Sequence, residues 1–253
     1  MIQVVIIGSG NVAQHLISAF AKCETVVVIQ AFARDKNSLT HLLDSNKITS
    51  NFTDLKEADL YIISVSDDAI TEVSSKIPFT NKLVAHTSGS FSLDDLDNKN
   101  RKAVFYPLQT FSKNVAINFK EIPICLEAQN KEDYTILEKV AQNISKKTYK
   151  INSEQRKALH VSAIFVCNFV NHLYQIGNEI CQENQLDFDI LKPLIQETAN
   201  KIMKLSPYDA QTGPAKRNDT QTINSHLNFL SDQNQKDIYK MLTKSIIDNG
   251  KKL

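Results

Sequence analysis

The chain has 253 residues, 42% of them hydrophobic, which allows one large core or two modest ones. Its 29 Lys and Arg residues nearly balance 28 Asp and Glu residues, so no excess charge favours a nucleic acid or an anionic membrane as partner. No apolar run approaches the roughly 20 residues of a membrane span, and the start of the chain lacks the basic lead of a signal peptide. We therefore expect a cytoplasmic protein that binds neither nucleic acid nor membrane.

The cysteines agree with a reducing compartment. The chain has four, with no CxxC motif and no paired spacing. Isolated cysteines of this kind are more typical of small buried side chains than of metal ligands or redox centres, and we predict no metal site. They are Cys23, Cys125, Cys167 and Cys181.

The first 150 residues alternate between strand-like and helix-like patterns. Residues 2–7 are apolar and β-branched except for Gln3, and they are followed by a glycine turn and by apolar residues at helical spacing from Val12 to Phe20. Continuous apolar strands that alternate with helices indicate a mostly parallel sheet covered on both faces, as in a Rossmann domain. Further strand-like runs are TVVVIQAF, DLYIISV, KLVAHTS, AVFYPL, IPICLE and KKTYKI.

The pattern becomes helical after residue 152 and stays so. We predict an α/β Rossmann domain over residues 1–151 and an all-α domain over residues 152–253, used for substrate binding and dimerisation. The first helix of the second domain starts at Ser153, and Pro193 either interrupts the next helix or marks its first turn. The other expected elements are a helix over 187–205, a loop over 209–218 and helices near 220–230 and 232–248.

The turn after the first strand carries the spacing G-x-G-x-x-A at Gly8, Gly10 and Ala13. In a strand-to-helix context this spacing is typical of dinucleotide binding, because the glycines permit a tight turn and a close approach of pyrophosphate to the backbone. A glycine turn without a ligand is the alternative. The predicted cofactor-binding residues of this turn are Gly8, Ser9, Gly10, Asn11 and Val12.

The end of the second strand favours NADP over NAD. NAD sites usually carry an acid there for the ribose hydroxyls, whereas this strand is followed by Ala33 and Arg34. Arg34 could pair with a 2′-phosphate, with Lys36 and Ser38 close by. Asp35 would reverse this preference if the strand ended one or two residues later.

Two later strand ends complete the predicted cofactor site. Val65 and Ser66 follow one strand, and Thr87 follows the next. Ligands bind at the carboxyl ends of parallel strands, and the small Ser64 and Ser66 would leave room for the cofactor. Simple helix capping by Ser66 or Asp67 is compatible with this interpretation.

Polar residues at the same sheet edge suggest a substrate site. His86 and Ser88 follow one strand, and Tyr106 and Gln109 follow the next. Each group alone could be a turn, but parallel strands bring both to one edge.

The first long helix of the second domain adds a polar stripe. At about 100° per residue, Asn168, Asn171 and His172 fall on the side of His160, with Gln175 between them. Buried amides need hydrogen-bond partners, which a polar ligand in a cleft or a network between helices would supply.

The stretch QTGPAKRND is predicted to present Gln211, Thr212 and Arg217 to the substrate and to cap a helix with Asp219. His226 lies seven residues after Asp219, about 10 Å along a helix, so no Asp–His dyad is expected. Thr222 lies between them on the same face as a candidate bridge.

Several long motifs resemble a bacterial family that joins a Rossmann-like domain to a helical domain of unknown function and whose members are described as NADP oxidoreductases. These motifs are IGSGNVA, HTSGS, YPLQTFSK, LHVSAIFVCNFVNHL, PLIQETANK and QTGPAKRND. More distantly, the layout is similar to 6-phosphogluconate and β-hydroxyacid dehydrogenases and to pyrroline-5-carboxylate reductase. The dehydrogenase pattern would place a Lys where this chain has Asn168. The reductase resemblance implies a homodimer built by the helical domains.

These observations lead to an NADP-dependent oxidoreductase that transfers a hydride to or from a small polar carbonyl, imine or hydroxyacid. An imidazole suits general acid catalysis near neutral pH. The alternative is a non-catalytic NADP-binding regulator or scaffold, while methyl transfer from S-adenosylmethionine lacks its expected acid. The candidate catalytic residues are His86, Tyr106, His160, Asn168 and His172, and the candidate substrate-binding residues are Ser88, Gln109, Asn171, Gln211, Thr212 and Arg217.

Overall fold

The computed structural model describes residues 1–112, 115 and 117–250. The chain divides into two compact units, Met1–Asn168 and Phe169–Leu253. The first contains a sheet with helices, and the described part of the second contains helices and no strand. No described helix has the length and apolar character required to cross a membrane.

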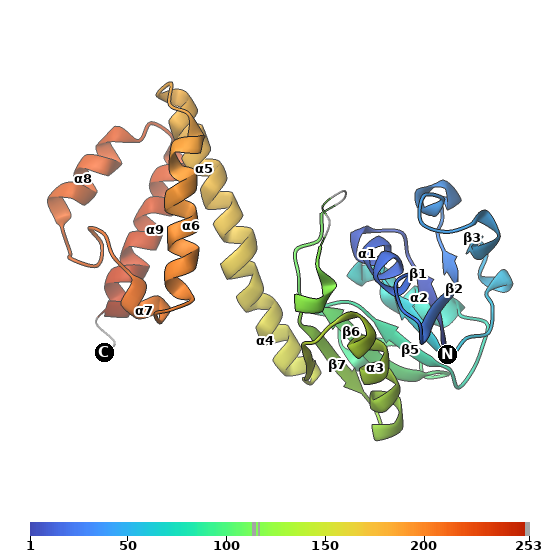
Figure 1. Ribbon diagram of the computed structural model, residues 1–253. Helices are drawn as coiled ribbons and strands as arrows, with labels where there is room; N and C mark the ends of the chain where they lie inside the picture. The colour runs from blue at the N-terminus through green and yellow to red at the C-terminus, as the bar shows by residue number, and fades with distance from the viewer. Residues whose placement is uncertain (113–114, 116, 251–253) are drawn as a thin grey trace. The chain divides into compact units, whose positions relative to one another are not determined.

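An eight-stranded sheet is the frame of the first unit (Figure 1). Its strand order is β3-β2-β1-β4-β5-β6-β7-β8, and every neighbouring pair is parallel except β6 and β7. The predicted mostly parallel sheet is confirmed, and the short β3 is an addition. The strands are β1 (Ile2–Ile7), β2 (Val26–Phe32), β3 (Ile48–Thr49), β4 (Leu60–Ile63), β5 (Leu83–His86), β6 (Arg101–Pro107), β7 (Ile124–Ala128) and β8 (Thr148–Lys150).

Both faces of the sheet are buried, which explains why the strands are apolar without alternation. On one face Val4 and Ile6 belong to the same core cluster as residues of α1 and α3. On the other face Val5 and Ile7 pack with Ile70 of α2. The helices of this unit are α1 (Asn11–Phe20), α2 (Ile70–Lys76), α3 (Lys131–Ile144) and α4 (Ser153–Ala163), with 3₁₀ turns η1 (Lys36–Leu39), η2 (Ser45–Lys47), η3 (Phe52–Asp54), η4 (Asp67–Ala69), η5 (Leu93–Asp95) and η6 (Phe119–Glu121).

The helix α4 starts at Ser153, as predicted, and Asn152 is its N-cap. The Asn152 side chain accepts from the Gln155 backbone N–H, and the Gln155 side chain accepts from the Asn152 N–H. This reciprocal capping box satisfies two backbone donors that the first turn leaves free.

The predicted uninterrupted α-helix over the following residues is wrong in one respect. A π-helical segment, η7 (Ile164–Phe169), separates α4 from α5 (Val170–Glu183). A π turn takes roughly one residue more than an α turn, so angles counted at about 100° per residue do not hold beyond Ile164. The alignment of Asn168, Asn171 and His172 with His160, which assumed uniform α geometry, is corrected accordingly.

The predicted domain boundary and the compact units divide the chain at different residues. Periodicity changes at residue 152, whereas the first unit continues to Asn168. The reason is packing, because Arg156 of α4 is buried and Leu159 joins a cluster with Val104 and Tyr106 of the sheet.

The second unit confirms two local predictions. Pro193 lies in the first turn of its helix, and the Asp219 side chain accepts from the Thr222 N–H as an N-cap. The other elements are η8 (Phe188–Leu191), α6 (Lys192–Ile202), α7 (Pro207–Ala210), α8 (Thr220–Phe229) and α9 (Gln233–Gly250). The predicted loop over 209–218 therefore begins after a short helix, and it contains Gly213 at a φ of +100°.

Candidate active site

The glycine turn between β1 and α1 has the geometry of a phosphate-binding turn. Gly8 has a φ of +137°, and a Cβ there would clash with the Ser64 carbonyl oxygen. Gly10 has a φ of −72°, and a Cβ there would meet no atom within 4 Å. Neither conformation nor packing therefore requires glycine at position 10, whereas close approach of a ligand would.

The neighbours of Gly10 stabilise the turn. The Gln14 amide donates to the Ser9 carbonyl at 2.9 Å, and the Asn11 amide donates to the Phe111 carbonyl at 2.9 Å. Val12 packs against the core cluster under α1. The backbone N–H groups at the start of α1 are the donors left for an anion.

The residues after β2 support the predicted choice of cofactor. The strand ends at Phe32, and Asp35 accepts from the Asn37 N–H at 3.0 Å as the cap of η1. No described residue forms a hydrogen bond or ion pair with the exposed Arg34 guanidinium. A cation is thus free at this strand end while the nearest acid is engaged.

The end of β4 is less open than predicted. Ser64 is buried, and its hydroxyl accepts from Thr87 Oγ1 at 3.3 Å, so the room expected at Ser64 is filled. Val65 is partly buried, and the exposed Ser66 is the N-cap of η4 without a side-chain capping bond. Ser66 therefore remains the accessible hydroxyl of this group.

His86 lies at the end of β5 and is fully buried. Its Nδ1 accepts from the Ser88 N–H at 3.1 Å, and its ring packs edge-on against Phe91 at 5.5 Å. Burial, with the nearby charge of Arg156, lowers the pKa of His86 to about 3. The ring is buried in this neutral state, and the catalytic role predicted for His86 stays a prediction.

Ser88 likewise has an internal role. Its hydroxyl accepts from the Ser90 N–H at 3.1 Å and from the Phe91 N–H at 3.0 Å, and the residue is buried. The segment 86–95, called the β5 loop below, is thereby shaped by its own side chains. The Ser88 hydroxyl is thus engaged within the loop, and its predicted contact with substrate stays a prediction.

Tyr106 and His160 come together at the end of β6. The Tyr106 hydroxyl and His160 Nδ1 lie 3.0 Å apart in a hydrogen bond, with rings nearly perpendicular. Burial raises the pKa of Tyr106 to about 12. A Cβ on Gly89 would lie 2.5 Å from His160 Nδ1 and 2.9 Å from Tyr106 Cζ. Gly89 thus makes room for this pair, which has a hydroxyl and an imidazole in contact.

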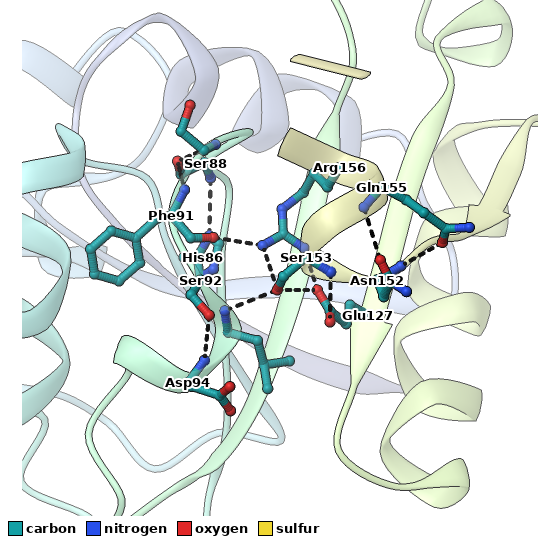
Figure 2. Close-up of polar contacts among 12 residues, drawn as sticks. His86, Ser88, Phe91, Ser92, Asp94, Glu127, Asn152, Ser153, Gln155 and Arg156 are labelled. Atoms are coloured by element: carbon teal, nitrogen blue, oxygen red, sulfur yellow. Dashed lines mark hydrogen bonds and ion pairs between the residues drawn. The ribbon is translucent and has the colours of Figure 1, made fainter. Parts of the chain in front are cut away.

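A buried polar network surrounds the start of α4 (Figure 2). Arg156, 1% exposed, forms an ion pair with Glu127 of β7, and donates to the Phe91 carbonyl at 2.6 Å and to Ser153 Oγ at 3.1 Å. Ser153 donates to Glu127 at 2.8 Å from its hydroxyl and at 2.9 Å from its backbone N–H. Arg156 and Glu127 were not predicted from the sequence, although the lone acid that ends the apolar run IPICLE was a signal for a partner.

The remaining predicted residues are exposed. In the first unit Gln109 accepts from the Thr110 N–H at 2.8 Å, and Asn168 is its last residue. In the second unit Gln211 donates to the Thr212 carbonyl. The roles predicted for these residues and for Asn171, His172 and Arg217 stay predictions.

No Asp–His dyad forms in the second unit, as expected. Thr222 Oγ1 donates to Asp219 at 2.8 Å, and His226 Nδ1 pairs with the Tyr239 hydroxyl at 2.8 Å. Thr222 therefore does not bridge the two. The described residues contain no group of three side chains that could hold a metal ion.

The parallel sheet, the glycine turn and the helical second unit define a nucleotide-binding oxidoreductase fold, and comparisons with other proteins agree. Residues 3–88 match the family described as NADP oxidoreductase coenzyme F420-dependent, and residues 122–246 match a domain of unknown function, DUF2520. A provisionally assigned NADP oxidoreductase from Bacteroides fragilis is 37% identical, with 98% of each chain covered and a TM-score of 0.89. The chain therefore belongs to this NADP oxidoreductase family with a DUF2520 domain.

More distant structures share the fold. Pyrroline carboxylate reductase from Plasmodium falciparum, solved with NADP bound, is 13% identical over 99% of this chain and 97% of that one, with a TM-score of 0.62. An imine reductase variant from Myxococcus stipitatus in complex with NAD⁺ is 13% identical over 99% and 94%, with a TM-score of 0.61. A comparison with curated protein sequences finds no match.

The buried neutral state of His86 predicts a pH-dependent stability. The pKa of His86 is about 3 in the folded chain and about 6.5 in the unfolded chain. The unfolded state binds the proton first as pH falls, so folding should lose about 2 kcal/mol between pH 7.5 and pH 5 from this group. Urea denaturation of the wild type and of His86→Gln at both pH values would measure it.

In His86→Gln this part of the pH dependence should be absent, whatever the variant's absolute stability. The exposed His41→Gln is the matched control and should keep the wild-type dependence. An equal loss in the wild type and His86→Gln would contradict the assignment.

Proposed function

We propose that the protein is a reductase that transfers a hydride from NADPH to a small polar carbonyl or imine, or removes one from the corresponding hydroxyacid, with Tyr106 and His160 handling the proton. The observation that carries this proposal is the 3.0 Å hydrogen bond between these side chains at the carboxyl end of β6. The strands β1, β4, β5 and β6 are mutually parallel, so this end lies on the same sheet edge as the glycine turn.

When bound, NADPH supplies the hydride, and the protein supplies position and a proton. The N–H groups at the start of α1, beside Gly10, are suited to the pyrophosphate, and Arg34 is suited to the 2′-phosphate. His160 Nε2 has no hydrogen-bond partner among the described residues. That nitrogen is therefore the atom available to protonate a substrate oxygen or nitrogen.

The Tyr106 hydroxyl supports both states of His160. The charged imidazolium donates its Nδ1–H to the Tyr106 oxygen, and its Nε2–H is the proton for the substrate. After transfer the neutral ring accepts the Tyr106 O–H at Nδ1, because a hydroxyl both donates and accepts. The phenol is protonated at neutral pH, and burial raises the pKa of Tyr106 further, to about 12. The pair thus keeps its hydrogen bond through the proton transfer.

Relatives with the same fold support the substrate class. Two of them are named as a pyrroline carboxylate reductase and an imine reductase. Both names denote reduction at a carbon–nitrogen double bond. Cofactor binding without turnover on a panel of imines, carbonyls and hydroxyacids would instead favour the scaffold alternative.

The second unit supports a homodimer. In its described part the buried apolar residues are Cys181 and Ala215 alone, whereas many large apolar side chains are exposed. An apolar groove of about 280 Å³ runs between α5, α8 and α9. A helical unit with so few buried apolar residues needs another surface to cover its exposed apolar side chains. A second copy of the unit exposes the same apolar side chains and is therefore a suitable partner. The exposed side chains include Leu194, Met203, Phe229 and Met241.

The Arg34 assignment predicts cofactor preference. Arg34→Ala should weaken NADPH binding by about 10- to 100-fold, the effect of losing a charge-assisted hydrogen bond worth about 1.5–3 kcal/mol, and should leave NADH binding unchanged. Fluorescence titration with both cofactors measures this. Lys47→Ala, which removes a surface cation paired with Asp44, is the control. Tighter binding of NADH than of NADPH by the wild type would refute the assignment.

Two glycine variants separate cofactor binding from proton transfer. Gly89→Ala should displace His160 from Tyr106 and lower kcat about 100-fold, with NADPH affinity kept. Gly10→Ala should abolish NADPH binding but leave the fold intact. The added Cβ would meet no protein atom within 4 Å and would occupy the space proposed for the pyrophosphate. Turnover and cofactor titration of both variants test this, and full activity of Gly89→Ala would exclude the pair from catalysis.

The dimer proposal predicts a mass of about twice 28.5 kDa in solution. Phe229→Glu should shift the protein toward monomer, because Phe229 is 65% exposed and lines the apolar groove. Asn224→Glu, on the same helix, adds the same charge at an exposed polar position and should remain dimeric. Light scattering after size-exclusion chromatography distinguishes these outcomes, and a monomeric wild type would end the proposal.

A further inference from the structure

We propose that the buried Glu127–Arg156 ion pair is a positioning device for His160, and this rests on the proton-transfer role proposed above for His160. Arg156 lies four residues before His160 on α4, one helical turn away on the same face. The ion pair fixes the first turn of α4, and the ring one turn later then meets Tyr106.

The Arg156 guanidinium joins three segments that are far apart in sequence. Its partners are the Glu127 carboxylate on β7, the Phe91 carbonyl in the β5 loop and the Ser153 hydroxyl at the start of α4. The N–H donors of a planar guanidinium point in fixed directions, so its hydrogen-bond partners have to lie within a narrow range of positions. The contacts with Glu127 and Phe91 tie α4 to β7 and to the β5 loop, and the contact with Ser153 within α4 orients the guanidinium.

Ser153 tightens the same connection. Its hydroxyl donates to Glu127 and accepts from the Leu93 N–H at 3.3 Å, while its backbone N–H donates to Glu127 at 2.9 Å. The carboxylate is thus held at the positive end of α4 by a backbone donor as well as by Arg156. Figure 2 shows Ser153 beside the Glu127 carboxylate, joined to it by both contacts.

The register of β6 and β7 matches the helical spacing. Val104 faces Glu127 and Tyr106 faces Cys125, so Tyr106 and Glu127 lie on one sheet face, two positions apart. Two strand residues span about 6.6 Å, and four helical residues rise about 6 Å. The two spacings are therefore of similar length, and their ends are joined by the Arg156–Glu127 ion pair and by the His160–Tyr106 hydrogen bond.

The same guanidinium also holds the β5 loop, which packs against the Tyr106–His160 pair. By binding the Phe91 carbonyl it holds the β5 loop, in which Ser88 fixes the N–H groups of Ser90 and Phe91. Gly89 lies in this loop, against His160 and Tyr106. One ion pair therefore positions the helix that carries the imidazole and the loop that leaves it space.

Apolar packing alone would not give this precision. On the sheet-facing side of α4, Leu159 is the residue that joins the apolar cluster with Val104 and Tyr106. Hydrophobic contact is non-directional, so a single leucine would permit sliding by a fraction of a turn. The ion pair supplies the directional constraint.

The test is a ¹⁵N NMR measurement of the His160 imidazole in the full-length protein, assigned by its loss in His160→Gln. Glu127→Gln and Arg156→Lys should shift the His160 nitrogen signals toward those of Gly89→Ala, and lower kcat by about 10- to 100-fold with the KM for NADPH unchanged. The control variants Arg101→Lys and Asp133→Asn disrupt another ion pair of the unit, in which Asp133 is fully buried. They should leave the His160 signals unchanged.

Wild-type His160 signals in a folded Glu127→Gln protein would overturn the proposal. If Glu127→Gln and Arg156→Lys fail to fold, Ser153→Ala, which keeps both charges, should still produce a smaller shift, and no shift would also overturn it. Absence of turnover in the wild type would reject the proposed function alone, because the NMR readout does not require catalysis.

Discussion

The buried ion pair of Glu127 and Arg156 is the constraint around which the candidate site is arranged. Ion pairs taken out of water gain little net stability, yet removal of one partner leaves a buried charge at a cost of about 3–5 kcal/mol. Their value lies in geometry. Here the ion pair connects β7, the β5 loop and α4, and its Arg156 charge adds to burial, the larger cause, in lowering the pKa of the neighbouring His86. His86 then accepts a backbone hydrogen bond and helps to shape the loop that faces His160.

Three glycines of the first unit are required for three different physical reasons. Gly8 needs a backbone conformation and a clearance that a side chain would violate, so it serves the fold. Gly89 clears space for two side chains, so it serves the Tyr106–His160 pair. Gly10 has an ordinary conformation and open surroundings at the N-cap of α1, so it serves the proposed close approach of a ligand. The distinction separates the structural part of the glycine motif from its binding part.

Sequence patterns predicted the features that depend on local periodicity. The Rossmann-like sheet, the helical second half, the cap at Asp219 and the place of Pro193 in the first turn of α6 follow from residue spacing and turn chemistry. The reversal of β7 could not be predicted, because an apolar run fits a parallel or an antiparallel neighbour. The π segment lies in a sequence that fits an uninterrupted α-helix, and burial of His86 depends on contacts with Phe91 and Arg156 that no spacing encodes. Tyr106 and His160 were both candidates, but 54 residues separate them, and only the fold brings them together.

The two units differ in how much of their apolar surface is buried. The first has apolar clusters on both faces of its sheet. These clusters stabilise the unit, so it tolerates a buried polar network where α4 packs on the sheet. In its described part the second exposes many large apolar side chains, and Gln235 is the largest of its buried residues. Helical stability in proteins comes mainly from packing of an apolar face rather than from intrinsic propensity. The proposed homodimer would supply such packing to the second unit, whereas the Tyr106–His160 pair lies within a unit that carries its own core.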